Sequence, residues 1–441
     1  MTLFPEIDPS TAPPPPAAPP AAPPLMEADR TQVFLRPLDL EGVLPADHPA
    51  RTVWLCVSRL DLAPFYAPIA SVDGAPGRPA IDPKILVTLW LYATSEGVGS
   101  ARALARLCTA HDAYRWICGG VEVCYHTLST FRVAHQAALD ALLTETLAVL
   151  LHQGLVTLTG VAQDGTRVRA DAGAASFRRE KSLRQCLAAA AAQVERCAAE
   201  DDAAAAARST RQAAAQARAA RERQGRVEQA LAELPAVRAA KKTAADRAEA
   251  RVSTTDPEAR VMKMADGGYR PAYNLQAATI PGSQVVVGVS VTNVGSDMAE
   301  APPMVAAVHT RCGQVPPAWL MDGGFAQHDA ITTVAAKGVT VYAPVPKARG
   351  ATDPYAPHAG DSPAVAAWRT RMATPEAKAI YKDRAATAEC VNALWKEHRG
   401  LQRLPVRGRA KVLTIALWHA VTHNLLRWIA LEQAAAAGAP A

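Results

Sequence analysis

The chain has 441 residues and a mass of 46.5 kDa, a length that predicts two or three domains with a sizeable hydrophobic core. Hydrophobic residues make up 49% of the chain but aromatic residues only 5%, which favours a helix-rich protein over an all-β fold. The formal net charge of +6 permits nucleic acid as a partner without requiring it.

The eight cysteines are scattered, without a C-x-x-C pair or a histidine at zinc-site spacing, which predicts reduced thiols. No run of about 18 apolar residues predicts a membrane span, and the N-terminus lacks the basic and apolar regions of a signal peptide. We therefore expect a cytoplasmic protein with no membrane partner.

Two kinds of sequence precede the first predicted strand. Residues 1–30 are rich in proline and alanine and are expected to form a disordered tail, because proline lacks the N–H that a helix needs. The pattern in residues 31–155 predicts short helices joined by tight turns. Asp82 and Ser100 are placed to cap two of these helices, and Thr127 to open a third. Such punctuated helices are typical of helix-turn-helix modules, so an all-α domain is predicted here.

The pattern changes to alternating apolar residues near Val156, which predicts a strand that ends at Asp164. From residue 176 to 253 the chain is almost wholly Ala, Arg, Glu, Gln and Lys, the composition of long helices. An inserted helical hairpin is therefore predicted, with its turn near Gly225 or Pro235. The plainest interpretation of this insertion is a solvated, charged helix pair without chemistry.

After the insertion, two apolar runs around Pro281-Gly282-Ser283 predict a β-hairpin, and the remaining stretches alternate between strand and helix. This order favours an α/β fold with a mixed sheet over residues 156–430, interrupted by the insertion. A late helix is predicted to start at Thr374-Pro375, and residues 431–441 are predicted to be an Ala-rich tail.

Three acidic residues are candidates for catalysis. Asp164 and Asp322 each follow an apolar strand, and Glu389 lies on the late helix. Two strand-end carboxylates that converge with a helix carboxylate can hold two Mg²⁺ ions about 4 Å apart for phosphoryl transfer, because hard oxygen ligands suit that metal. The alternative is structural, since both aspartates precede glycine and Asp-Gly is a common turn dipeptide.

A series of short motifs runs along the chain. They are Gly77-Arg78-Pro79, Asp82-Pro83, Ala113-Tyr114-Arg115-Trp116, His126 to Arg132, Asp164-Gly165-Thr166, Asp266-Gly267-Gly268-Tyr269, Tyr273 to Ala277, Thr292-Asn293, Asp297, Asp322-Gly323-Gly324-Phe325, Thr374-Pro375-Glu376, Tyr381, Arg384, Glu389, Lys396 and His423-Asn424-Leu425-Leu426. With these motifs, in this order, the chain from about Leu35 to Trp428 resembles the DDE transposases of bacterial insertion sequences, whose catalytic domain has an RNase H-like fold. Phe325 stands where that family usually has tyrosine.

The resemblance implies that Asp164, Asp322 and Glu389 are the metal-binding catalytic triad, with Mg²⁺ or Mn²⁺ as the cofactor. It also implies a helical N-terminal domain that binds DNA and an RNase H-like catalytic domain interrupted by the helical insertion.

The same resemblance implies that Tyr381, Arg384 and Lys396 contact phosphates near the cleaved DNA end, a role that suits the planar fork of Arg and the point charge of Lys. Glu389 and Lys396 are seven residues apart and share a helix face. Arg384 and Glu389 are five apart, about 140° around a regular α-helix, so both can face the site only if the helix is distorted or Arg384 reaches around. The alternative for Tyr381 and Arg384 is an exposed helix surface.

Further basic residues are candidate DNA contacts. Arg132, on the helix opened by Thr127, is predicted to enter the major groove, with core packing as the alternative. A basic run after the late helix is expected on a loop beside the active site, because Pro405 and Gly408 disfavour a continuous helix; the alternative is a solubilising loop. The run consists of Arg399, Arg403, Arg407, Arg409 and Lys411.

These observations predict a DNA transposase that binds the ends of an insertion sequence, cuts a strand and transfers it into target DNA. We expect it to act at the bacterial nucleoid and to form a homo-oligomer when the ends are paired. Two alternatives stay open: an inactive relative that only binds DNA, against which the intact carboxylates argue, and an RNase H-like nuclease that only hydrolyses.

Overall fold

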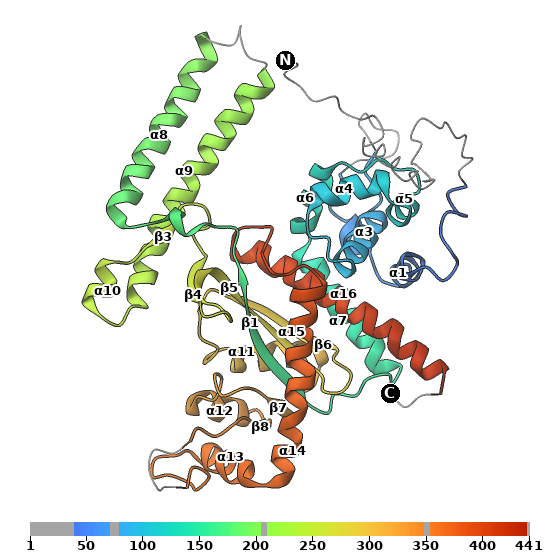
Figure 1. The fold of residues 1–441 in the computed structure, drawn as a ribbon, viewed down its shortest axis with the longest axis vertical. Helices are drawn as coiled ribbons and strands as arrows, with labels where there is room; N and C mark the ends of the chain where they lie inside the picture. Colours follow the sequence, from blue (N-terminus) through green and yellow to red (C-terminus); the bar gives the residue numbers. More distant parts are fainter. Residues whose placement is uncertain (1–38, 71–78, 204–209, 348–352, 439–441) are drawn as a thin grey trace, which may run out of the picture. The chain divides into compact units, whose positions relative to one another are not determined.

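The computed structural model describes residues 39–70, 79–203, 210–347 and 353–438 (Figure 1). The tail predicted at residues 1–30 lies outside the described residues. Among the helices of the described part of the chain, none is long and apolar enough to cross a membrane.

The N-terminal region is all helical, as predicted, and its caps are those expected from the sequence. The side chain of Asp82 accepts a hydrogen bond from Lys84 N at 2.8 Å, and that of Ser100 accepts one from Ala103 N at 3.3 Å. The third predicted helix starts at Tyr125, two residues before Thr127. The helices are α1 (Pro49–Val57), α2 (Ala63–Tyr66), α3 (Pro83–Ser95), α4 (Ala101–Ala110), α5 (Asp112–Cys118), α6 (Tyr125–Ala134) and α7 (Gln136–His152).

The helical insertion is present, but its turn was predicted at the wrong place. Gly225 and Pro235 both lie inside α9, and the connection between α8 and α9 falls at residues 204–209, outside the described residues. Strands β2 and β3 pair antiparallel at the base of the insertion. The elements are η2 (Ala174–Ser176), β2 (Phe177–Arg178), α8 (Glu180–Ala203), α9 (Thr210–Ala239), α10 (Ala244–Ala248) and β3 (Val252–Ser253).

The rest of the described chain contains a mixed sheet with helices between and after its strands, which confirms the α/β prediction. Its order is β4-β5-β1-β7-β8, with β6 also paired to β5. Strand β1 runs antiparallel to β5 and parallel to β7, and β7 runs parallel to β8, which is the arrangement of an RNase H-like sheet. The strands are β1 (Val161–Arg169), β4 (Arg260–Lys263), β5 (Tyr269–Thr279), β6 (Val286–Thr292), β7 (Ala318–Leu320) and β8 (Thr340–Tyr342).

The remaining helical segments lie between and after the sheet strands, and the later ones bring the C-terminal part of the chain back to β1. Segments α14 to η4 follow one another as a single rod, and η3 contacts β1 (Figure 1). The segments are α11 (Ala301–Cys312), α12 (His328–Ala335), α13 (Pro363–Ala373), α14 (Pro375–Arg384), the π-helical turn η3 (Ala385–Glu389), α15 (Cys390–Ala393), the π-helical turn η4 (Leu394–His398) and α16 (Arg409–Ala436).

Helix α16 joins the N-terminal helices to the sheet. It packs against α7, α3 and β6, and the side chain of Asn424 bonds both the N–H and the carbonyl oxygen of Val286 at 2.8 Å. The helix continues to Ala436, so the prediction that a separate tail begins at residue 431 is wrong. The apolar positions of α16 keep it helical past that point because they remain packed as far as Leu431.

Candidate active site

The sequence analysis placed Asp164 at the end of a strand, but Asp164 lies within β1. It is paired with Ala277 of β5, and the following Gly165 continues the strand. A Cβ atom on Gly165 would collide with the amide of Gln276 and the carboxylate of Asp297, so glycine is needed here for close packing. The turn interpretation of this Asp-Gly pair is therefore wrong.

Asp322 follows β7 and does form a turn, since its Oδ1 accepts a hydrogen bond from Gly324 N at 2.7 Å. Its strand runs parallel to β1 with Ala162 opposite Leu320. Continuing that register by two residues places Asp322 beside Asp164 at the same edge of the sheet. The second Asp-Gly pair thus forms a turn and also presents a site carboxylate.

Glu389 reaches the same place because the helix that carries it departs from α geometry. Residues Ala385–Glu389 form a π-helical turn, in which hydrogen bonds span five residues, so positions 384 and 389 lie on one face. Arg384 Nη1 donates to Glu389 Oε1 at 2.7 Å. The helix distortion that the five-residue spacing required is present.

The guanidinium of Arg384 brings the three carboxylates together. Besides its bond to Glu389, its Nη2 lies 3.3 Å from Asp164 Oδ1 and 3.6 Å from Asp322 Oδ2. The Arg384 side chain is only 7% exposed, whereas that of Glu389 is 56% exposed, so the cluster is closed on one side and open on the other. The exposed-helix alternative for Arg384 is therefore wrong.

Asn392 is a site residue that the sequence analysis missed. Its Nδ2 donates to Asp164 Oδ2 at 2.9 Å, and its Oδ1 is buried without a hydrogen-bond partner in the described part of the chain. Burial raises the pKa of Asp164; the bond from Asn392 and the charge of Arg384 lower it, and the neighbouring Asp322 and Glu389 raise it. The spacing of three residues from Glu389 could have indicated Asn392, because such positions share a helix face.

Tyr381 and Lys396 lie half-buried near the same carboxylates. Burial lowers the pKa of Lys396, and the negative charge of Asp164 partly restores it. Burial likewise raises the pKa of Tyr381, which Arg384 lowers and the three carboxylates raise. Both side chains are therefore close enough to the cluster to sense its charge.

A strained residue in the β5–β6 turn supports the π-helical turn. Gln284 has a φ of 59°, in the left-handed region that disfavours side chains, and its Nε2 donates to Ala386 O at 3.0 Å. His423 of α16 in turn donates from Nε2 to Gln284 O at 2.8 Å. This chain of contacts connects α16 to the segment between Arg384 and Glu389.

The prediction that Arg132 enters a DNA groove is wrong in this structure. Arg132 is 6% exposed, its Nη1 donates to the carbonyl oxygen of Gly99, and its guanidinium lies 5.0 Å from the ring centroid of Trp90. The residue faces inward because α6 packs against α3 and α16 on that side.

The basic run after η4 does not form one DNA-facing loop. Arg399 is half-buried and donates to His423 Nδ1 at 2.9 Å, and burial lowers its pKa to about 10. Arg403 and Arg407 are on the predicted loop but both pair with Asp171, at 3.0 and 2.9 Å. Arg409 and Lys411 are exposed and belong to the first turn of α16, because the helix starts directly after Gly408.

The donor chemistry of the cluster suits a hard divalent cation, since Asp164, Asp322 and Glu389 offer only carboxylate oxygens. Within the described residues, no three His, Cys, Asp or Glu side chains are arranged to share one metal ion. The guanidinium of Arg384 lies between the three carboxylates instead, as an internal cation.

Two family models match the chain. One, described as "Transposase domain (DUF772)", covers residues 38–134, and the other, described as "Transposase DDE domain", covers residues 237–425. The second match includes Asp322 and Glu389 and begins after β1, so it does not include Asp164. No curated protein and no solved structure matches the chain.

Proposed function

Because the chain belongs to the DDE transposases of insertion sequences, we propose that it cuts DNA at the ends of its element and joins the freed 3′-end to target DNA. The DDE domain implies metal-dependent phosphoryl transfer on DNA. The observation that carries the assignment of this chemistry to particular residues is the convergence of Asp164, Asp322 and Glu389 on one guanidinium.

The three carboxylates would hold the metal. They place three negative charges against the single positive charge of Arg384, and part of the raised pKa of Asp164 comes from the other two carboxylates. The site therefore favours additional positive charge. Bound there, Mg²⁺ or Mn²⁺ would neutralise charge on the attacking and leaving oxygens of the phosphoryl transfer.

The other side chains would position the DNA strand. Arg384 presents a planar fork that suits phosphate oxygens, so it can exchange the carboxylates for a phosphate when the strand enters. Lys396 and Tyr381 lie close enough to the cluster to bind the neighbouring phosphates. Asn392 holds one oxygen of Asp164 and thereby orients the other.

Single substitutions of the triad test this proposal. We expect Asp164→Asn, Asp322→Asn and Glu389→Gln each to lower strand cleavage at least about 100-fold, because an amide is a poor ligand for a hard cation. DNA affinity measured in EDTA is expected to stay unchanged. Glu376→Gln, an exposed position on α14, is the matched control and is expected to cleave normally.

Cleavage by any triad variant at the wild-type rate would remove that residue from the triad. Wild-type protein that binds the element ends but cleaves with neither Mg²⁺ nor Mn²⁺ would favour the inactive relative. Cleavage without joining of the 3′-end to target DNA would favour the hydrolytic nuclease. We also propose that copies of the chain assemble on paired ends in the nucleoid, which the mass of the protein–DNA complex checks.

A further inference from the structure

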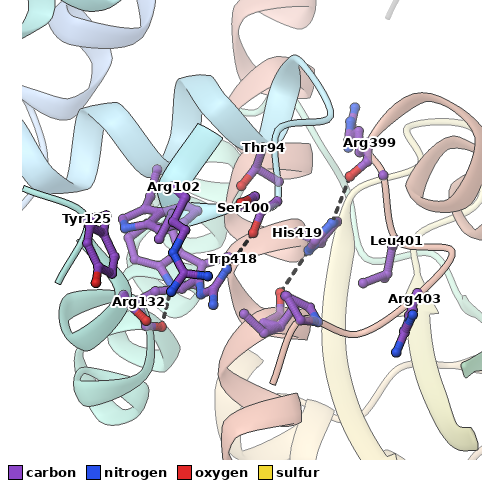
Figure 2. A pocket seen from close by; sticks show the side chains of 17 residues that line it. Thr94, Ser100, Arg102, Tyr125, Arg132, Arg399, Leu401, Arg403, Trp418 and His419 are labelled. Carbon is purple, nitrogen blue, oxygen red and sulfur yellow. Dashed lines mark hydrogen bonds between the residues drawn. The ribbon is translucent and has the colours of Figure 1, made fainter. Parts of the chain in front are cut away.

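A pocket of about 380 Å³ lies where α4 and α6 meet α16 and the loop before it (Figure 2). In Figure 2, Arg102, Tyr125 and Arg132 approach it from one side, and Arg399, Leu401 and Arg403 from the other. None of the described residues that line the pocket is acidic. The lining carries four arginines, of which Arg403 is paired with Asp171 outside the pocket, and none of the three triad carboxylates belongs to it.

Two of its arginines rest on aromatic rings and not on carboxylates. The guanidinium of Arg102 lies 5.0 Å from the ring centroid of Tyr125, and that of Arg132 lies 5.0 Å from the ring centroid of Trp90. The rings hold the guanidinium planes in place while leaving their charge uncompensated. An anion is the partner that such an arrangement lacks.

Arg132 is the clearest sign of a missing ligand. It is 94% buried, since its exposure is 6%, and its Nε has no hydrogen-bond partner among the described residues. Burial alone lowers its pKa to about 10. A buried cation without a counter-ion is costly, so binding an anion beside it would recover part of that cost.

The start of α4 adds a second source of positive potential. Ser100 caps this helix of 10 residues, and Ser100, Ala101 and Arg102 all line the pocket. The unpaired N–H groups of a helix N-terminus and its dipole favour phosphate and carboxylate groups. The helix end and the buried Arg132 thus point independently to an anion in the same pocket.

We propose that this pocket, here called the arginine pocket, binds a phosphate group of a DNA strand. Arginine forks match phosphate oxygens in a bidentate geometry. The choice of DNA as the source rests on the proposed function. A continuous chain segment connects the two sites, because Arg399 follows Lys396 by three residues.

The test is DNA binding by the full chain in EDTA, so that cleavage is not measured. A labelled duplex of the element's terminal repeat is titrated at several salt concentrations. Arg102→Ala is expected to weaken binding about tenfold and to flatten the slope of log affinity against log salt by about 1, as for the loss of one phosphate contact. Arg106→Ala is the matched control, because Arg106 is exposed on the same helix and does not line the pocket.

Neutral methylphosphonates, introduced one at a time into the same duplex, locate the contact. One position is expected to weaken binding by wild-type protein and to have no further effect on Arg102→Ala, because both changes remove the same interaction. Arg132→Lys keeps the positive charge but loses the planar fork of arginine. This variant is expected to weaken the contact to that one phosphate and to leave the contacts to the other phosphates unchanged.

Equal affinity and salt slope for wild type and Arg102→Ala would overturn the proposal. Binding of inorganic phosphate or thymidine monophosphate that depends on Arg102, with an unchanged DNA slope, would overturn DNA as the source and assign the pocket to a free phosphorylated ligand. Either result leaves triad-dependent cleavage intact, so the two proposals fail separately.

Discussion

The inserted hairpin, α8 and α9, and the segment from α14 to η4 are made of similar residues but behave differently. Both are rich in alanine and in charged residues, with arginine as the main cation of the hairpin and lysine of the C-terminal segment. In the hairpin, most of the described charged side chains stay exposed, and some pair along the helix, as the exposed Arg184 does with the partly buried Glu180. In the C-terminal segment, two π-helical turns interrupt the helix, and Arg384 is buried against three carboxylates.

The difference shows what composition determines and what it leaves open. Either sequence forms helix, because its residues have high helix propensity. The first of the two π-helical turns, η3, occurs where the helix passes β1 and where Gln284 bonds Ala386 O. π-Helical turns are rare overall, and those that occur are often found at functional sites. The irregular geometry is therefore found in the segment that carries Arg384 and Glu389, whereas the insertion is regular.

Among variants that keep the three carboxylates, the largest effect is expected from removing the buried arginine. Arg384→Met should make Mn²⁺ bind the DNA-free protein about tenfold more tightly. The guanidinium lies beside the carboxylates that would hold the metal, and two positive charges about 4 Å apart repel each other by about 1 to 4 kcal/mol. Strand cleavage should nevertheless fall at least about tenfold, since the phosphate contact is lost. Mn²⁺ binding is measured by electron paramagnetic resonance.

Arg184→Met in α8 is the control for this prediction and is expected to change neither quantity, because it removes only an exposed ion pair. Weaker Mn²⁺ binding by Arg384→Met would show that the guanidinium holds the carboxylates together and does not compete with the metal.

Two glycines, one in β1 at the site and one in the hairpin, extend the contrast between the site and the insertion. Gly165→Ala beside Asp164 should lower the free energy of unfolding by about 1 to 3 kcal/mol, because the new methyl group meets Gln276 and Asp297. Gly225→Ala inside α9 should raise it by about 0.5 to 1 kcal/mol, because nothing lies within 4 Å of the added atom and alanine favours helix. Thermal melting of both variants measures the two signs; equal signs would contradict the comparison.

Acid should destabilise the region held by α16. Burial lowers the pKa of His423 from 6.5 to about 3, so between those values the unfolded chain binds a proton that the folded chain does not. Stability should therefore fall as pH falls through this window, by about 1.4 kcal/mol per pH unit for this residue. Denaturant unfolding at several pH values measures the slope, which His423→Gln should flatten and the exposed His152→Asn should leave unchanged.

The smallest effect is expected at the support of the π-helical turn. Gln284→Ala removes the bond to Ala386 O and should slow strand cleavage by about fivefold, a change of about 1 kcal/mol. Hydrogen exchange at residues 385–389 should become faster. Gln224→Ala, which removes a bond to Glu228 within α9, should change neither; unchanged exchange in Gln284→Ala would remove Gln284 as a support.

The site was partly predictable from the sequence. The convergence of Asp164, Asp322 and Glu389 was predicted from their strand and helix positions and from the family resemblance, and the structure brings them to one guanidinium. Asn392 was missed although its spacing of three residues from Glu389 places it on the same helix face, because spacing alone does not show which side chain bonds a buried carboxylate oxygen. Arg132 was misplaced because helical spacing does not show which face is covered when another helix comes from far along the chain.

The sequence by itself determined the helical N-terminal region, the alternation of strand and helix after the insertion and the helix caps at Asp82 and Ser100, because these depend on local propensity and on side chains two or three residues away. The short strands β2, β3 and β4 were not predicted. Only the tertiary structure decided that β1 and β7 lie in parallel register, that the helix before Glu389 adopts a π turn, and that α16 covers Arg132. These outcomes depend on contacts between residues 100 or more positions apart. Their energies come from packing and burial across the fold, which local sequence patterns do not encode.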